Sequence, residues 1–285
     1  MKPHYRCTLS PMVVAIFCCF LAAPAAAGSE RWMTATELRQ DGMPVSLEIV
    51  IDTPQGAGPF PVVLFNHGST GRGNDTALFK RTWTSSAVSR FFNDRGWAVV
   101  YPQRRGRGQS GDLYDEGFEL DRSRYSCEPA LSLAGLQRAK EDLSAVLKVL
   151  PQRPELDLTR MLIGGQSRGG ILAMAYAGEH PQRFAGALSF VGGWISDLCP
   201  RAVDINHATF AQSGRFGKPT LWIYGENDPF YKLEHSRLGF AEYQRGGGQG
   251  TFELVRLAPG NSGHNVIAFP DQWQPLVSRY LEGIR

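Results

Sequence analysis

The chain has 285 residues, a formal net charge of +3 at neutral pH, and 42% hydrophobic and 11% aromatic residues. This length suits one large α/β domain, and the apolar content is sufficient for a hydrophobic core. Neither the apolar nor the aromatic content indicates a disordered chain or a membrane protein. So small a charge predicts neither a nucleic-acid partner nor an anionic membrane surface.

The first 27 residues have the pattern of a secretory signal peptide. Lys2 and Arg6 form a positive segment, residues 12–22 are a short apolar run, and the alanines at 25–27 fit the small-x-small cleavage rule. We therefore expect residues 28–285 to be exported to the periplasm or the medium. So short an apolar run predicts no stable membrane anchor. Cleavage removes two cations and no acidic residue, so the formal charge falls from +3 to +1.

Two cysteines, Cys127 and Cys199, remain in the predicted mature chain. An even number of cysteines in an oxidising compartment makes a disulfide the default expectation. Two free buried thiols are the alternative, because the sequence does not show whether the two Cα atoms lie within bridging range.

The first half of the mature chain alternates strand and helix patterns. Alternating polarity in residues 32–52 predicts a peripheral antiparallel hairpin. Continuous apolar runs at 60–65 and 97–101 predict buried strands, and the segment between them, 85–95, predicts a helix. Residues 112–132 are rich in charge and aromatic side chains and have no clean period, so we expect an irregular excursion there.

The second half continues this alternation up to the C-terminal helix. The predicted elements are a helix at 136–150, a strand at 160–163, a helix at 171–177, a strand at 185–191, an irregular excursion at 192–217, a strand at 220–224, a helix at 234–244, a strand at 251–255 and a helix at 272–283. Mostly unbroken apolar strands alternating with helices predict a single α/β domain, residues 28–285, whose mostly parallel central sheet has helices on both faces.

Between the strand at 160–163 and the helix at 171–177 lies the pattern G-x-S-x-G, which runs from Gly165 to Gly169. A strand, a tight turn, a serine and a helix in this order are typical of a nucleophile elbow. Such a turn exposes the Ser167 hydroxyl, and its glycines leave room for the crowded backbone. The alternative is a glycine-rich turn that contains an ordinary serine.

A serine hydroxyl is a weak nucleophile that needs a base, and the base needs an orienting acid. Asp228 follows the predicted strand at 220–224, and His264 lies in the loop after the last strand. A turn-forming aspartate beside Pro229 and an incidental loop histidine are the alternatives. The order Ser167, Asp228, His264, each after a predicted strand, favours a catalytic triad.

Residues His67-Gly68-Ser69 end the first long strand. An oxyanion hole needs one donor from the residue after the nucleophile and one from the loop at this position. We therefore expect the Ser69 and Arg168 amides to form it. His67 is expected to shape the loop and not to act as the base, because it precedes the elbow.

These motifs together resemble the α/β-hydrolase superfamily, and within it dienelactone hydrolases and prolyl-oligopeptidase-type enzymes. The matching stretches are residues 61–68, 101–111, 165–170, 224–229 and 262–264. Dienelactone hydrolases carry a cysteine nucleophile where this chain has Ser167. Prolyl-oligopeptidase-type enzymes usually carry a propeller, whereas only about thirty residues of the expected mature chain precede the first long strand here. That difference makes peptidase activity the weaker expectation.

The resemblance implies acyl transfer to water through an acyl-enzyme on Ser167, with neither a metal nor an organic cofactor. We expect an exported serine carboxylesterase that acts on a small-molecule ester. One alternative is a small exopeptidase or amidase of the same fold. The other is a non-catalytic binding protein that keeps the fold, because fold alone does not give function.

The pattern leaves substrate specificity open. The irregular excursions at 112–132 and 192–217 follow the strands on either side of the elbow strand in chain order. Loops at that edge of the sheet build substrate pockets in open α/β folds. A Cys127–Cys199 bridge would tie the two excursions together over the site. Arg104, Arg105 and Arg107 either attract an anionic substrate or form a solvated loop. Four aromatic residues either line a pocket or belong to the core: Trp83, Tyr114, Tyr125 and Trp194.

Overall fold

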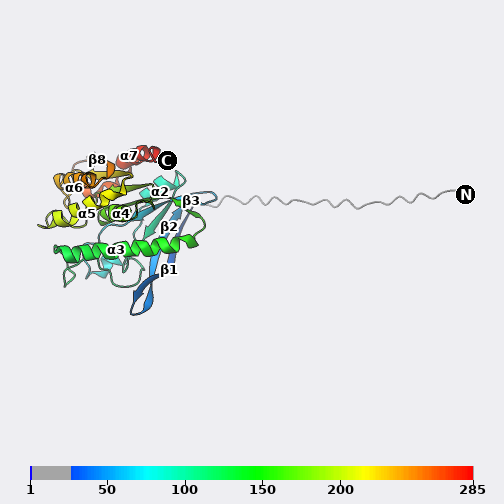
Figure 1. Cartoon of the computed structure of the whole chain (residues 1–285), viewed down its shortest axis with the longest axis horizontal. Coiled ribbons are helices and arrows are strands. Elements are labelled where there is room, and N and C mark those ends of the chain that lie inside the picture. The colour runs from blue at the N-terminus through cyan, green and yellow to red at the C-terminus, as the bar shows by residue number, and fades with distance from the viewer. Residues whose placement is uncertain (2–26, 285) are drawn as a thin grey trace.

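The computed structural model describes Met1 and residues 27–284, and its core is one eight-stranded sheet. The strand order is β1-β2-β4-β3-β5-β6-β7-β8, with helices packed around it (Figure 1). The signal-peptide prediction falls on residues 1–27, which lie outside the described residues except for Met1 and Ala27.

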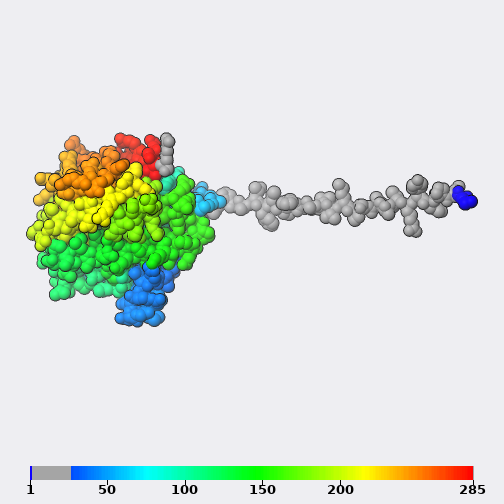
Figure 2. Space-filling model, in the orientation of Figure 1, coloured from blue at the N-terminus to red at the C-terminus, as the bar shows by residue number. Residues whose placement is uncertain are grey.

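An antiparallel hairpin forms one edge of the sheet. Strands β1 (Gly28–Gln40) and β2 (Met43–Thr53) are joined through Asp41 and Gly42, whose φ angles are 49° and 79°. Two successive positive φ angles fit the twist of a tight hairpin turn, which explains the Asp-Gly pair. The tip of the hairpin projects from the body (Figures 1 and 2), while β2 pairs antiparallel with β4 (Ala98–Pro102).

The remaining strand pairs are parallel. Their strands are β3 (Phe60–Asn66), β5 (Leu156–Gln166), β6 (Gly186–Phe190), β7 (Pro219–Gly225) and β8 (Gln249–Val255). Strand β6 is buried throughout, as expected for a parallel sheet that is covered on both faces. Parallel strands end at the same edge, so the loops after β3, β5, β6 and β7 meet there.

Seven α-helices occur among the described residues. They are α1 (Thr76–Phe79), α2 (Ser86–Asn93), α3 (Pro129–Val149), α4 (Arg168–Glu179), α5 (Ala208–Ser213), α6 (Leu233–Arg245) and α7 (Pro270–Glu282). Helix α2 contacts α7, whereas α3, α4, α5 and α6 contact one another in succession (Figure 1). The predicted mostly parallel sheet with covering helices is confirmed.

Strand β5 and helix α4 begin a few residues before their predicted starts, the short helix α1 is not among the predicted elements, and both excursions differ from the prediction. Helix α3 starts at Pro129, inside the expected excursion at 112–132, because proline is favoured in the first turn of a helix. The excursion at 192–217 is helical in its second half, with a π-helical turn at Val203–His207, then α5, then a short 3₁₀ turn at Gly214–Phe216. These pieces are too short to show a helical period in the sequence.

Candidate active site

Ser167 lies in the turn between β5 and α4, with φ 56° and ψ −123°. A positive φ is uncommon for a residue with a side chain and is held only where the surroundings determine it. Here the Ser167 N–H donates to Phe190 O over 2.8 Å, and Ser167 O accepts from the N–H groups of Gly170 (2.8 Å) and Gly193 (3.2 Å). The turn is therefore fixed by the neighbouring strand and by the loop that follows it.

The two outer glycines of G-x-S-x-G are required by close backbone approach. A Cβ atom on Gly165 would lie 2.3 Å from Gly169 O, and one on Gly169 would lie 2.2 Å from Asn66 O. These distances leave no space for a side chain. The motif thus brings the end of β3 against the start of α4, which places the loop after β3 beside Ser167.

Asp228 and His264 meet at the same edge of the sheet. His264 Nδ1 donates to Asp228 Oδ2 over 2.8 Å. The other carboxylate oxygen, Oδ1, accepts from the backbone N–H groups of Phe230 (2.8 Å) and Tyr231 (3.1 Å). The Asp228 side chain is 1% exposed and that of His264 is 14% exposed. A carboxylate held in this way fixes both the orientation and the tautomer of the imidazole.

Ser167 and His264 line one cavity of about 260 Å³, which we call the Ser167 cavity. Its other lining residues are Ser69, Gly71, Arg124, Tyr125, Arg168, Trp194, Ile195, Ser196, Phe230 and Tyr231. Within the described chain Ser167 Oγ makes no hydrogen bond to His264. Such a bond is often long without substrate and tightens in the complex.

The two predicted oxyanion donors also line this cavity. Neither the Ser69 N–H nor the Arg168 N–H donates a hydrogen bond to any described residue. Arg168 is the first residue of α4, so its N–H has no acceptor in the helix and lies at the positive end of the helix dipole. The next amide of the loop, Thr70 N–H, donates to Tyr125 Oη over 3.2 Å, which anchors the loop.

His67 is fully buried beneath this loop. Burial, reinforced by the Arg104 and Arg107 cations, holds the pKa of His67 well below its usual value, so the ring is neutral. Its Nδ1 lies 2.8 Å from Gly68 O, and its Nε2 accepts from the Arg104 N–H over 3.4 Å, so the proton is assigned to Nδ1. The contact fastens the ring to its own loop.

Two aromatic residues at this site, Phe230 and Tyr231, are not among those predicted from the sequence. The Phe230 ring lies edge-on to His264 with centroids 4.7 Å apart, and the Tyr231 ring lies 5.6 Å away. Tyr231 Oη donates to Gly193 O over 2.7 Å. The two rings enclose the imidazole. Their position directly after Asp228-Pro229 is the only trace of this role in the sequence.

The alternative of a solvated arginine loop after β4 is wrong. Arg104, Arg105 and Arg107 are only 1%, 9% and 6% exposed. Arg104 forms an ion pair with Glu116, and Arg105 forms one with Asp142. Both carboxylates are distant in sequence, so a local charge pattern could not show these pairs.

Arg168 carries its side chain into the same buried network. Its guanidinium lies 3.4 Å from the centroid of the Tyr125 ring and 4.1 Å from that of Trp194, and Nη1 donates to Glu116 O over 2.7 Å. Cation–π contacts of this kind stabilise a desolvated arginine. Tyr125 and Trp194 thus form a wall of the Ser167 cavity, and the Arg168 guanidinium that packs against both rings fixes this wall in place.

The other two aromatic candidates pack elsewhere. Trp83 stacks against Phe65 at 6.1 Å, and Tyr114 stacks against Phe79 at 5.3 Å. Neither lines the Ser167 cavity. Of the four aromatic candidates, Tyr125 and Trp194 line the Ser167 cavity, Trp83 lines a neighbouring cavity that shares Ser69 with it, and Tyr114 lines neither.

A disulfide joins Cys127 to Cys199, which are 72 positions apart in sequence and have Cα atoms 5.7 Å apart. Tyr125 and Trp194 lie shortly before these cysteines, so the bridge ties together the two segments that form the aromatic wall.

Opening this bridge is expected to lower the free energy of unfolding by about 2–4 kcal/mol, because a long closed loop restricts the unfolded chain. Urea unfolding of the wild type with and without reductant measures this loss. The double variant Cys127→Ser, Cys199→Ser should be equally weakened and insensitive to reductant. A wild type that is equally stable when mass spectrometry shows open thiols would contradict the expectation.

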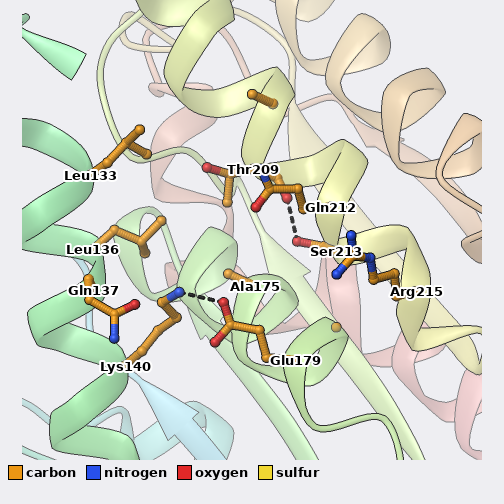
Figure 3. Close-up of a pocket in the computed structure, with 12 residues that line it drawn as sticks. Leu133, Leu136, Gln137, Lys140, Ala175, Glu179, Thr209, Gln212, Ser213 and Arg215 are labelled. Carbon is orange, nitrogen blue, oxygen red and sulfur yellow. Dashed lines mark hydrogen bonds and ion pairs between the residues drawn. The ribbon is translucent and has the colours of Figure 1, made fainter. Parts of the chain in front are cut away.

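A separate hollow lies between α3, α4 and α5 (Figure 3). Figure 3 shows Lys140 of α3 directed at Glu179 of α4, with which it forms an ion pair, and Ser213, which donates to Thr209 O. Its lining includes none of Ser167, Asp228 and His264. Its lining contains no histidine, and its one serine hydroxyl, Ser213, is engaged with Thr209 O, so the hollow offers no nucleophile–base pair of the Ser–His kind.

No helix in residues 27–284 is both long and apolar enough to cross a membrane. Over the same part of the chain, no three histidine, cysteine, aspartate or glutamate side chains gather in a way that would hold a metal ion.

The chain is similar to several known hydrolases. Residues 83–198 match the model of the prolyl oligopeptidase family. A search of curated proteins found no match. The esterase Pf2001 of Pyrococcus furiosus is similar in structure, with a TM-score of 0.60 and 15% identity over 90% of this chain and 93% of the esterase.

Two further solved structures are similar. The acylaminoacyl peptidase of Pyrococcus horikoshii matches with a TM-score of 0.61 and 17% identity, over 90% of this chain and 41% of the peptidase. The dienelactone hydrolase-like promiscuous phosphotriesterase P91 from metagenomic libraries matches with a TM-score of 0.58 and 18% identity, over 90% of this chain and 99% of P91. At such identities the likeness establishes a shared fold.

Proposed function

We propose that this chain, which has the fold of the α/β-hydrolase superfamily and resembles its serine hydrolases, cleaves carboxylic esters through an acyl-enzyme on Ser167. The observation that carries the proposal is the His264–Asp228 hydrogen bond of 2.8 Å at a cavity that Ser167 also lines. Ser167 sits there on a strained turn, as a nucleophile elbow requires.

Each residue has a defined role in the proposed reaction. Ser167 Oγ attacks the ester carbonyl while His264 Nε2 takes its proton. Asp228 holds Nδ1–H and stabilises the imidazolium that forms. The unengaged amides of Ser69 and Arg168 stabilise the tetrahedral oxyanion, and His264 then protonates the leaving alcohol. Water, activated by the same imidazole, releases the acid and restores Ser167.

Ester cleavage is favoured over aminopeptidase cleavage by the lining of the Ser167 cavity. Among the described residues that line it there is no aspartate or glutamate, and its basic side chains are Arg124, Arg168 and His264. A free amino terminus would need a carboxylate partner to be bound in such a cavity. Amidase activity on an uncharged amide and ligand binding without catalysis are the remaining alternatives.

We also propose that the enzyme is exported. The support is the signal-peptide pattern in residues 1–27 together with the Cys127–Cys199 bridge, because disulfides persist mainly in oxidising compartments. Expression of the full chain with a C-terminal tag, followed by cell fractionation and N-terminal sequencing, tests this. Export with a mature terminus near Gly28 is expected, and an uncleaved cytoplasmic protein would refute it.

The activity is tested with short-chain and long-chain 4-nitrophenyl esters beside an aminoacyl 4-nitroanilide. We expect ester turnover, with a chain-length preference that reports the size of the Ser167 cavity. A fluorophosphonate should modify one peptide, the one that contains Ser167. Anilide turnover without ester turnover would favour the peptidase alternative, and a folded protein that neither turns over nor is labelled would favour the binding protein.

A further inference from the structure

A second cavity, of about 520 Å³, adjoins the Ser167 cavity and shares Ser69 with it. We call it the Arg107 cavity. Its lining is Ser69, Thr70, Leu78, Arg81, Thr82, Trp83, Thr84 and Arg107. Hydroxyl groups and two guanidinium groups dominate this lining, in contrast to the aromatic wall beside Ser167.

Arg107 differs from the other two arginines of its loop. It is 6% exposed, yet within the described chain no carboxylate lies within ion-pairing distance of it. Its Nε has no hydrogen-bond partner, and its one protein contact of this kind is a long bond of 3.5 Å from Nη1 to Leu78 O. Arg104 and Arg105, by comparison, each face a buried carboxylate.

Glu48, on strand β2, is not a counter-charge for Arg107. Glu48 forms an ion pair with Arg31 at 2.9 Å and accepts hydrogen bonds from Thr82 Oγ1 (2.8 Å) and from Gln109 N–H (2.6 Å). Its capacity to accept is therefore largely used. Arg81, at the mouth of the cavity, is exposed and has no ion pair among residues 27–284.

A buried guanidinium without a counter-charge is costly, because the charge has lost its water and gained no partner. Burial accordingly lowers the pKa of Arg107. The cost is offset when a ligand brings an anion, and the planar fork of a guanidinium suits a carboxylate. Arg107 is the one buried cation of this lining and matches the single charge of a carboxylate, while Arg81 is exposed and keeps its water.

We propose that the Arg107 cavity binds a carboxylate on the ester substrate, so that the enzyme prefers esters that carry a negative charge. The inference rests on the proposed function, because it places the scissile carbonyl at Ser167. Ser69 forms a wall of both cavities, so a substrate held at its amide extends directly from one cavity into the other. Arg107 is a binding residue in this scheme, and Arg81 attracts the anion at the mouth.

Two matched pairs of esters test the proposal and identify which half of the substrate enters the cavity. Mono-4-nitrophenyl glutarate and its methyl ester differ by a charge on the acyl side. 4-Carboxyphenyl butyrate and its methyl ester differ by a charge on the alcohol side. We expect at least one pair to show kcat/KM about ten to a hundred times higher for the charged member, the size of a charge-assisted hydrogen bond.

The charged-to-neutral ratio should collapse towards one in Arg107→Gln and should be partly kept in Arg107→Lys. Arg215→Gln, which changes an exposed arginine outside both cavities, is the matched control and should keep the ratio. Calorimetry with glutarate and with benzoate measures binding without turnover. The wild type should bind one of them and Arg107→Gln should not.

The outcomes separate the two proposals. Neutral esters that are hydrolysed with no charge preference, or with a preference that survives in Arg107→Gln, would overturn the carboxylate site and leave the esterase standing. Absence of turnover on every ester would refute the esterase, and the calorimetry alone would then decide whether Arg107 binds carboxylates.

Discussion

Replacing Ser167 with alanine is expected to lower kcat for ester hydrolysis by about 10⁵–10⁶-fold, because the acyl-enzyme cannot form. KM should change little, since the wall of the Ser167 cavity that binds the ester stays in place. Steady-state kinetics with a 4-nitrophenyl ester measures both constants. Rapid quenching followed by mass spectrometry should detect the acylated wild type and no acylated variant.

Asp228→Asn is expected to lower kcat less than Ser167→Ala does. The amide can hold the imidazole in the wrong tautomer, so kcat should fall by about 10⁴-fold while the acyl-enzyme still forms slowly.

Ser86→Ala, which removes an exposed hydroxyl at the start of α2, is the matched control for Ser167→Ala and should leave kcat unchanged. If purified Ser167→Ala kept more than about one hundredth of the wild-type rate, another group would be the nucleophile and the proposed mechanism would be wrong.

The sequence predicts the sheet well because its signals are local. A short unbroken apolar run such as 60–65, preceded by Gly58-Pro59, favours a strand that is buried on both faces, and parallel strands end at one edge. Asp228 and His264 could therefore be placed near Ser167 from their positions after strands alone. Gly165 is equally local, since a Cβ atom there would meet Gly169 O in the same turn, whereas Gly169 is required by the approach of Asn66 on β3.

Features that depend on distant partners could not be predicted in this way. The loop of Arg104, Arg105 and Arg107 is polar in sequence, but the fold brings Glu116 and Asp142 to it and buries all three side chains. The same composition describes a solvated loop until those partners are known. The short helical turns between residues 203 and 216 are likewise stabilised by burial against the rest of the fold. Each turn is too short to show a hydrophobic period in the sequence.

Glu116→Gln should lower the free energy of unfolding by about 3–5 kcal/mol. Glu116 is 2% exposed and forms ion pairs with Arg104 and, at 3.5 Å, with Arg168, each of which is 1% exposed. Removing its charge leaves two buried guanidinium groups without a counter-charge. For a domain of this size we expect the melting temperature to fall by roughly 10 °C, as measured by calorimetry.

The loss should be specific to the buried network and should depend on pH. Glu119→Gln, in the same segment but without an ion pair among residues 27–284, is the matched control and should change stability by less than about 0.5 kcal/mol.

Burial by itself would raise the pKa of Glu116, but Arg104 and Arg168 lower it overall, so its stabilising charge is complete at neutral pH. That contribution is lost only as the pH falls through this lowered pKa, where the wild type and Glu116→Gln should converge. A gap between the two proteins that stayed constant into strong acid would show that the amide perturbs packing, and a loss below about 1 kcal/mol at neutral pH would show that the two arginines find other partners.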